Sequence, residues 1–137
     1  MCDSRPVSFG WQYEFRQRDW TEVRDVLAGV EWRDQEPEYL FRIIDSVVDA
    51  GGDELLAVTT SMHDLVIAPL PIEDPPFDVV LVAAPGSARI HPAGTVRIDY
   101  QGVNGRSTEL VRPAAEALSL LWRFMEVEFG IRQTKPR

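Results

Sequence analysis

The sequence predicts an α+β domain: a mainly antiparallel sheet of five or six strands, a C-terminal helix packed across it and two N-terminal helices beside it. Three observations support this fold class. Apolar residues alternate with polar ones near the N-terminus, they recur at helical spacing in three segments, and four or five β-rich runs separated by turn residues precede the last of those segments. The expected order of elements is β-α-α-β-β-β-(β)-β-α.

Segment 7–15 has the clearest strand pattern in the chain. Its apolar members, at every second position, are Val7, Phe9, Trp11, Tyr13 and Phe15. Strict alternation is typical of a half-buried strand, so we expect these side chains to share one face and to pack in the core. Trp11 and Tyr13 are also candidates for the walls of a ligand pocket.

Two amphipathic helices should follow. Asp19 and Glu22 have the spacing of a capping box at the start of a helix that ends near Gly29. Pro37 suits the first turn of a second helix over residues 37–50, which two consecutive glycines terminate. The polar residues of this second helix would form an exposed strip.

The middle of the chain has the pattern of strands joined by turns. Residues 61–64 would join the first two strands as a four-residue turn, and four prolines between residues 69 and 76 indicate a stiff surface loop. The run 78–84 is nearly continuous in apolar residues, as expected of a central strand buried on both faces. The predicted strands are 55–60, 65–70, 78–84 and 95–101, with an optional short strand at 88–91.

The last predicted element is a helix over residues 112–129, which begins beside Pro113 and stops at Gly130. Its apolar arc is wide and has Phe124 near the centre, so we expect this helix to be the main core element. Glu128 falls inside the arc, where a buried carboxylate would have to be paired or neutral. The alternative is a frayed helix end, from which the carboxylate reaches solvent.

Length and composition indicate one domain, 1–137, with residues 1–5 and 132–137 as disordered tails. The longest apolar run has seven residues, far fewer than the roughly 18 of a membrane span. No secretory signal is recognisable, and the single cysteine cannot form an internal disulfide. We therefore expect a cytoplasmic protein without membrane contact. The excess of arginine over lysine is what a GC-rich bacterial genome produces.

No motif in the sequence identifies an enzyme. Phosphate-binding glycine loops are absent, and one cysteine with two histidines cannot supply a structural zinc tetrad. His63 and His91 lie in predicted turns, where we expect them to be exposed and neither catalytic nor metal-binding. Ser61, His63 and Asp64 are nearly adjacent, whereas a hydrolase triad needs side chains that converge from separate elements. We predict no catalytic residue, no metal and no cofactor.

The net charge of −8 is carried entirely by the first half of the chain. Residues 1–68 contain fourteen carboxylates and six arginines, whereas residues 69–137 contain eight charges of each sign. Segment 31–54 is the most acidic, with eight carboxylates against two arginines. Such a field repels nucleic acids and anionic lipids and attracts basic proteins, although acidic residues also serve simply to keep a small domain in solution.

The leading functional hypothesis is a non-enzymatic acidic binding protein that recognises a basic protein partner, as an inhibitor, an immunity protein or an adaptor does. The expected partner-binding residues are Glu36, Glu38, Asp45 and Asp49. Asp45 and Asp49 are one helical turn apart, and a basic partner would offset their repulsion. The sequence leaves the oligomeric state open.

The alternative hypothesis is a small-molecule binding protein or a small enzyme with a pocket between the sheet and the C-terminal helix. Its candidate ligand-binding residues are Trp11, Tyr13, Trp122 and Glu128. A cavity of at least about 300 Å³ at that interface would distinguish this alternative from the leading hypothesis.

Overall fold

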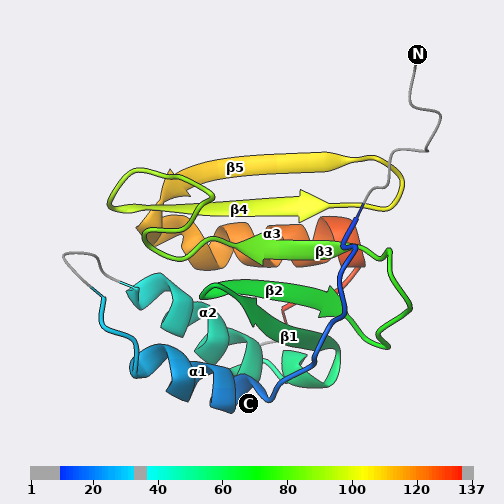
Figure 1. The fold of residues 1–137 in the computed structure, drawn as a ribbon, viewed down its shortest axis with the longest axis horizontal. Helices are drawn as coiled ribbons and strands as arrows, with labels where there is room; N and C mark the ends of the chain where they lie inside the picture. The colour runs from blue at the N-terminus through cyan, green and yellow to red at the C-terminus, as the bar shows by residue number, and fades with distance from the viewer. Residues whose placement is uncertain (1–9, 33–36, 134–137) are drawn as a thin grey trace.

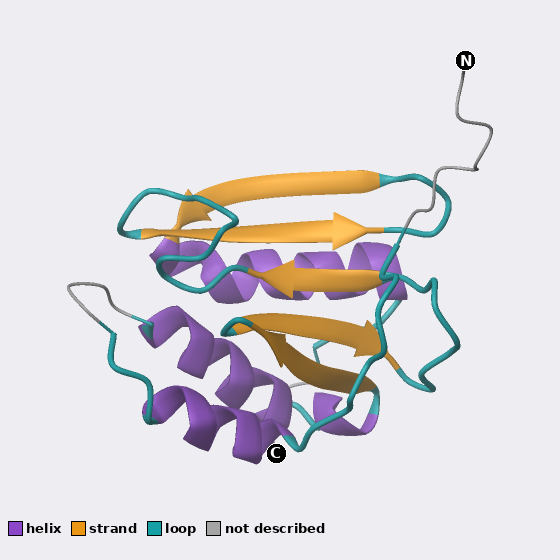
Figure 2. Cartoon of the chain, viewed as in Figure 1, coloured by secondary structure: helices purple, strands orange, loops and turns teal. Residues whose placement is uncertain are grey.

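The computed structural model describes residues 10–32 and 37–133 (Figure 1 and Figure 2). Its helices are α1 (Trp20–Ala28), α2 (Glu38–Asp49) and α3 (Ala117–Phe129), with the short 3₁₀ helices η1 (Gly52–Glu54) and η2 (Ala114–Glu116). Its strands are β1 (Leu56–Ser61), β2 (Asp64–Pro69), β3 (Val79–Val82), β4 (Thr95–Gln101) and β5 (Ser107–Pro113). The fold is α+β as predicted, with one five-stranded antiparallel sheet, two helices before it and one after it.

The sheet is a meander, in which the spatial order of the strands follows their order in the chain. Its first hairpin is tighter than predicted, because Ser61 pairs with Asp64 and only Met62 and His63 form the turn. Both turn residues have positive φ, at 54° and 84°, as a two-residue turn of the I′ type requires. The predicted four-residue turn over 61–64 is therefore wrong by one residue at each end.

All three helices pack on one face of the sheet and enclose the main core. Alternate strand residues face this layer, among them Val58, Ile67 and Ile98, which are completely buried. Phe124 of α3 lies in the same core, as its central position in the apolar arc predicts. Complete burial of one such side chain contributes about 1.5–3 kcal/mol, so this layer supplies much of the folding free energy.

Helix α1 begins where the sequence predicts, with Asp19 as its N-cap. The Asp19 carboxylate accepts hydrogen bonds from the backbone N–H groups of Thr21 at 2.8 Å and Glu22 at 3.4 Å. Helix α2 lies within the predicted span 37–50 and buries its apolar side against the sheet. The two N-terminal helices therefore form as their apolar spacing indicates.

The predicted strand at 7–15 is not a strand over the described residues 10–15. Trp11 and Arg18 each form only an isolated bridge, with Phe77 and Val58 respectively. Between these two points the chain runs without regular pairing toward α1 (Figure 1). The rest of the predicted strand, residues 7–9, lies outside the described residues.

The described aromatic residues of this segment do not share one buried face. Trp11 packs in a second, smaller core on the sheet face opposite the helices, and Phe15 packs beside it. Tyr13, by contrast, is 68% exposed. Among the described residues of the segment, Trp11 and Phe15 follow the predicted burial pattern and Tyr13 does not, because the segment crosses the sheet and does not lie along a neighbouring strand.

Residues 107–113 form β5, although the sequence pattern places no strand there. This strand lies at the border of the sheet and most of its side chains are exposed, so it lacks the apolar alternation that identifies inner strands. Because β5 and η2 occupy this part of the chain, α3 begins at Ala117 and not at the predicted Arg112. The optional strand at 88–91 is not formed.

None of the described helices is long and apolar enough to cross a membrane. The predicted tail at 1–5 and most of the tail at 132–137 lie outside the described residues. Arg132, the first residue of the second predicted tail, forms an ion pair with Glu126 of α3 at 3.3 Å. The described chain therefore ends in contact with the helices.

Candidate functional site

The outer surfaces of α1 and α2 are acidic. They contain five exposed carboxylates, namely Glu22, Asp25, Glu38, Asp45 and Asp49. Arg24 and Arg42 are the two cations of the same helices. The helical period directs apolar residues to the core and leaves charged residues along the outer strip of each helix. We name these seven residues the acidic face.

Three of the four expected partner-binding residues belong to the acidic face. Glu38, Asp45 and Asp49 are exposed, and together with Arg42 they follow one another along one side of α2 at intervals of three or four residues. The fourth, Glu36, lies outside the described residues. The exposed strip predicted for the second helix is therefore present.

One ion pair joins the two helices across the acidic face. Arg24 Nε lies 2.8 Å from Asp45 Oδ1 and Nη2 lies 3.3 Å from Asp45 Oδ2, and this hydrogen-bonded carboxylate raises the pKa of Arg24. The Arg24 guanidinium also lies over the Phe41 ring, 5.2 Å from its centroid. The chain itself thus offsets the repulsion between Asp45 and Asp49, so that repulsion is no argument for a partner.

A cleft of 430 Å³ opens at the N-terminal end of α2. Glu38 and Arg42 of the acidic face line it on one side. The opposite walls are the loop 85–94 and the short chain segment between β5 and α3. The cleft therefore lies next to the acidic face and shares two charged residues with it.

Hydrogen bonds hold the walls of this cleft in place. His91 Nδ1 lies 3.1 Å from Thr95 Oγ1, and His91 Nε2 lies 3.2 Å from the Ala84 carbonyl oxygen. The Tyr39 hydroxyl donates to the Ala83 carbonyl at 2.6 Å, and burial raises the pKa of Tyr39 well above its ordinary value. His91 is therefore partly buried, and the expectation that it is exposed is wrong.

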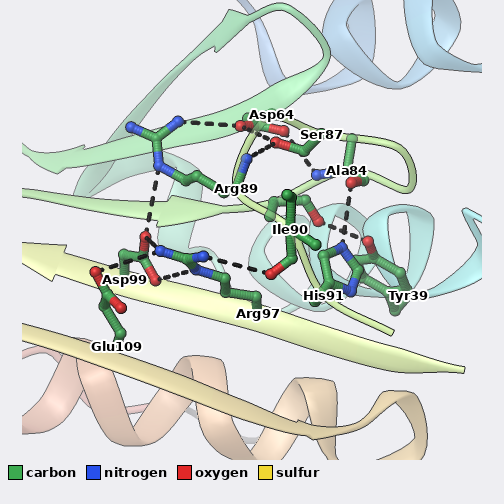
Figure 3. A network of polar contacts seen from close by, with 11 residues as sticks. Tyr39, Asp64, Ala84, Ser87, Arg89, Ile90, His91, Arg97, Asp99 and Glu109 are labelled. Atoms are coloured by element: carbon green, nitrogen blue, oxygen red, sulfur yellow. Dashed lines mark hydrogen bonds and ion pairs between the residues drawn. The ribbon is translucent and has the colours of Figure 1, made fainter. Parts of the chain in front are cut away.

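A chain of alternating charges lies on the sheet face opposite the helices (Figure 3). Its members are Asp64, Arg89, Asp99, Arg97 and Glu109. Asp64, only 2% exposed, accepts hydrogen bonds from the Ala84 backbone N–H at 2.7 Å, from Ser87 Oγ at 2.8 Å and from Arg89 Nη1 at 3.2 Å. These contacts fasten the loop that follows β3 to the sheet.

Asp99 is the centre of the network and is 3% exposed. Arg97 contacts both of its oxygens, through Nε at 3.0 Å and Nη2 at 3.1 Å, and this pairing raises the pKa of Arg97. Arg89 Nε lies 3.5 Å from Asp99 Oδ2, and Glu109 lies 3.3 Å from Arg97 Nη2. Both buried carboxylates are paired, as buried charges must be.

Sequence reasoning missed this network, because it assigned Asp64 to a turn and singled out neither Asp99 nor Arg89. The register of the strands places both carboxylates under the loop that carries Arg89, and no local pattern signals that approach. The network positions the loop that continues into the cleft wall. Its role here is to support the cleft.

The four residues of the alternative pocket are not brought together. Trp11 and Tyr13 lie on the sheet face opposite the helices, with their ring centroids 5.2 Å apart. Trp122 lies on the helix side, where its indole Nε1 donates to Ser46 Oγ at 2.9 Å. Because the sheet separates them, these side chains cannot line one pocket.

Glu128, the fourth residue of that set, is engaged elsewhere. Its side chain is 6% exposed and accepts a hydrogen bond from Arg106 Nη2 at 2.6 Å on Oε2. Arg106 also lies over the Tyr100 ring, 5.7 Å from its centroid, and burial raises the pKa of Tyr100 to about 12. The carboxylate is thus paired, one of the two outcomes predicted for it, and ties the β4–β5 turn to α3.

In the part of the chain that the structure describes, no group of three histidine, cysteine or carboxylate side chains is placed to hold a metal ion. His63 is exposed on the first hairpin, with its ring 5.6 Å from that of Trp32. Comparison with protein-family models, curated proteins and solved structures finds no match to this chain.

Proposed function

We propose that the protein is a non-enzymatic binding protein, of the inhibitor, immunity or adaptor type, that recognises a basic protein partner through the acidic face. The observation that carries the proposal is the charge of this surface: five exposed carboxylates on two adjacent helices, against two guanidinium groups. One of these guanidinium groups, Arg24, is bound to Asp45. Charge of one sign on one face steers a partner of the opposite sign.

Two further features support a protein as the partner. Val26 is 44% exposed, and the partly buried Phe41 lies beneath Arg24, so apolar surface is present among the charges. Protein interfaces combine an apolar centre with a polar rim. The ion pair between α1 and α2 also holds the Asp45 carboxylate in place before binding, which limits the ordering cost of association at that residue. The cytoplasm is the compartment in which we place this interaction.

The direct test is a charge reversal on the acidic face with a matched control. The test variant carries Asp25→Lys, Glu38→Lys and Asp49→Lys, and retains Asp45 because it holds Arg24. The control carries Glu73→Lys, Asp74→Lys and Glu116→Lys, three exposed positions outside α1 and α2. Both variants have the same net charge, so a difference between them reports where the charge lies.

Each protein is immobilised and used to capture proteins from a lysate of its source organism, with identification by mass spectrometry. The wild type and the control should retain the same basic protein, and the acidic-face variant should lose most of it. Equal retention by all three proteins, or a captured partner that is not basic, would contradict the proposal.

A small-molecule site in the cleft beside α2 is the second candidate, because its 430 Å³ lies within the roughly 300–1,000 Å³ of ligand pockets. Its position differs from the pocket expected between the sheet and the C-terminal helix. Ala93→Trp would fill the cleft from the exposed loop. A metabolite library screened by thermal shift should then contain a compound that stabilises the wild type and not this variant; a library without one would reject the candidate.

A further inference from the structure

The two border strands of the sheet are protected unequally. At β1, the Val58 carbonyl accepts a hydrogen bond from the Arg18 backbone N–H at 2.9 Å, and the Leu56 carbonyl accepts one from the Trp20 indole at 3.0 Å. Within the described chain, β5 has backbone pairing with β4 alone, and it forms the opposite border of the sheet in Figure 1. An unpaired border strand is a template for another strand.

The ladder between β4 and β5 decides which groups of β5 face outward. Gly102 donates its N–H to the Arg106 carbonyl at one end, and Ala114 donates to the Gly94 carbonyl at the other, both at 2.9 Å. Antiparallel partners alternate between hydrogen-bonded and non-hydrogen-bonded pairs, so these two bonds set the phase of the whole strand. The residues whose N–H and C=O groups point away from β4 are Ser107, Glu109 and Val111.

One side chain covers part of this edge. Arg112 Nη1 donates to the Val111 carbonyl at 3.0 Å. Both residues are exposed, so the bond competes with water and the arginine can turn aside at small cost. The N–H and C=O groups of Glu109 and the N–H group of Val111 have no such cover among the described residues.

Charge favours a second copy of this chain as the occupant. Residues 69–137, which include β5, carry eight charges of each sign, whereas the excess of −8 lies in residues 1–68. Helices α1 and α2, which carry the acidic face, lie at the β1 side of the sheet (Figure 1), although Glu38 and Arg42, at the N-terminal end of α2, face the segment that follows β5 across the cleft. Two copies that meet at β5 therefore keep their acidic faces at opposite ends and bring neutral halves together.

The sequence of β5 favours one register of self-pairing over its neighbours. A two-fold axis at Leu110 places Glu109 opposite Val111 of the second copy, and both residues have outward N–H and C=O groups. An axis at Glu109 would place two carboxylates directly opposite one another, which is destabilising. An axis at Val111 would leave only the pair of Val111 with itself fully hydrogen-bonded, because Glu109 would lie opposite Pro113, which has no N–H to donate; the axis at Leu110 moves Pro113 outward to Ser107 and keeps both pairs of Glu109 with Val111.

We propose that β5 pairs antiparallel with β5 of a second copy in the register centred on Leu110. The two sheets then form one continuous sheet across the two-fold axis, and the dimer presents two acidic faces at its far ends. Nothing in this inference depends on the identity of a partner for the acidic face, so either proposal can fail alone.

The first test is the mass in solution, by sedimentation over a range of concentrations. The wild type should reach twice the monomer mass of 15.5 kDa, and Val111→Pro should remain at 15.5 kDa because it lacks the outward N–H. Val111→Thr keeps that N–H and should still dimerise. Circular dichroism establishes that each variant is folded. A wild type at the monomer mass at every concentration would overturn the proposal, leaving the edge to a strand of another protein.

The second test reads the register and does not depend on the proline variant. In a Cys2→Ser background, Leu110→Cys should form a disulfide between copies on mild oxidation, because a non-hydrogen-bonded antiparallel pair has Cα atoms about 4.5 Å apart. Thr108→Cys is the control on the same strand face, and its two copies would lie about 13 Å apart. A dimer in which Leu110→Cys does not cross-link, or both variants cross-link equally, would contradict this register.

Discussion

The β1 end and the β5 end of the sheet differ in charge and in protection. At the β1 end, α1 and α2 carry the acidic face, and Arg18 and Trp20 cover the strand edge. At the β5 end, charges are paired within the chain, as between Arg97 and Asp99, while the strand edge is open. The β1 end therefore has net negative charge and a covered strand edge. The β5 end has an open strand edge and no net charge.

The two proposals thus assign two kinds of recognition to opposite ends of one small domain. Net charge acts over a Debye length of about 8 Å and directs the approach of a partner. Backbone pairing acts only at contact and depends on register. Both ends of the sheet share one core, and each end has stabilising contacts of its own.

The largest effect is expected in the shared core. Phe124 of α3 packs in the core that contains residues of all three helices and of β1 to β4, so Phe124→Ala should lower the free energy of unfolding by about 3–5 kcal/mol. Arg123→Ala, at the neighbouring exposed position, should change it by less than about 0.5 kcal/mol. Urea unfolding measures both values. Equally mild effects would mean that α3 is not the element that unites the two ends.

The second largest effect is expected in the charge network around Asp99, at the β5 end of the sheet. Asp99→Ala removes the buried carboxylate that Arg89 and Arg97 share and should cost about 1.5–3 kcal/mol, because it removes charged hydrogen bonds and leaves each guanidinium group with a single carboxylate, Asp64 or Glu109. Glu109→Ala removes an exposed member of the same network and should cost no more than about 1 kcal/mol. Thermal unfolding of the two variants provides the comparison. Equal losses would show that burial does not distinguish the two carboxylates.

Alkaline pH should weaken both ends through their buried tyrosines. Burial raises the pKa of Tyr39 and, to about 12, that of Tyr100, whereas an unfolded tyrosine has a pKa of about 10. Their contribution to stability is therefore complete below pH 10 and is lost as the pH rises from about 10 toward 12. Urea unfolding across this range should show the loss, and Tyr39→Phe with Tyr100→Phe should reduce it. If the double variant kept the pH dependence of the wild type, the loss of stability could not come from Tyr39 and Tyr100.

The smallest effect is expected at the start of α1. Hydrogen bonds from the Thr21 hydroxyl, and from the backbone N–H groups of Thr21 and Glu22, lower the pKa of Asp19 from its ordinary 3.8. The stabilisation is therefore complete above pH 3.8 and is lost as the pH falls through the lower folded value. Asp19→Asn keeps the cap without the charge and should flatten this part of the acid-unfolding curve. A curve identical to that of the wild type would exclude Asp19 as a contributor.

Much of the fold could be predicted because the helix side of the sheet follows simple periodicities. Alternate apolar residues such as Val96 and Ile98 face the helices, and the spacing in α2 places its carboxylates outward without further information. The acidic strip was predictable for the same reason, since a helix that buries one side must expose the other.

The remainder depends on contacts between distant segments. Asp64 and Asp99 are buried because Arg89 and its loop lie over them, an arrangement that no local pattern encodes. Strand β5 escapes prediction because its side chains are mostly exposed, and its edge becomes visible only from the order of the strands. The cleft likewise consists of residues from three separate regions, namely α2, the loop 85–94 and η2, so no local motif indicates it.

The central claim is that the acidic face directs a basic partner to the β1 end. The measurement that tests it most directly is the association rate constant of the captured partner as a function of ionic strength, for the wild type and for the variant with Asp25→Lys, Glu38→Lys and Asp49→Lys. The wild-type rate should fall steeply between low and physiological salt, and the variant should associate slowly at every salt concentration. Equal rates for the two proteins, with no dependence on salt, would contradict the claim.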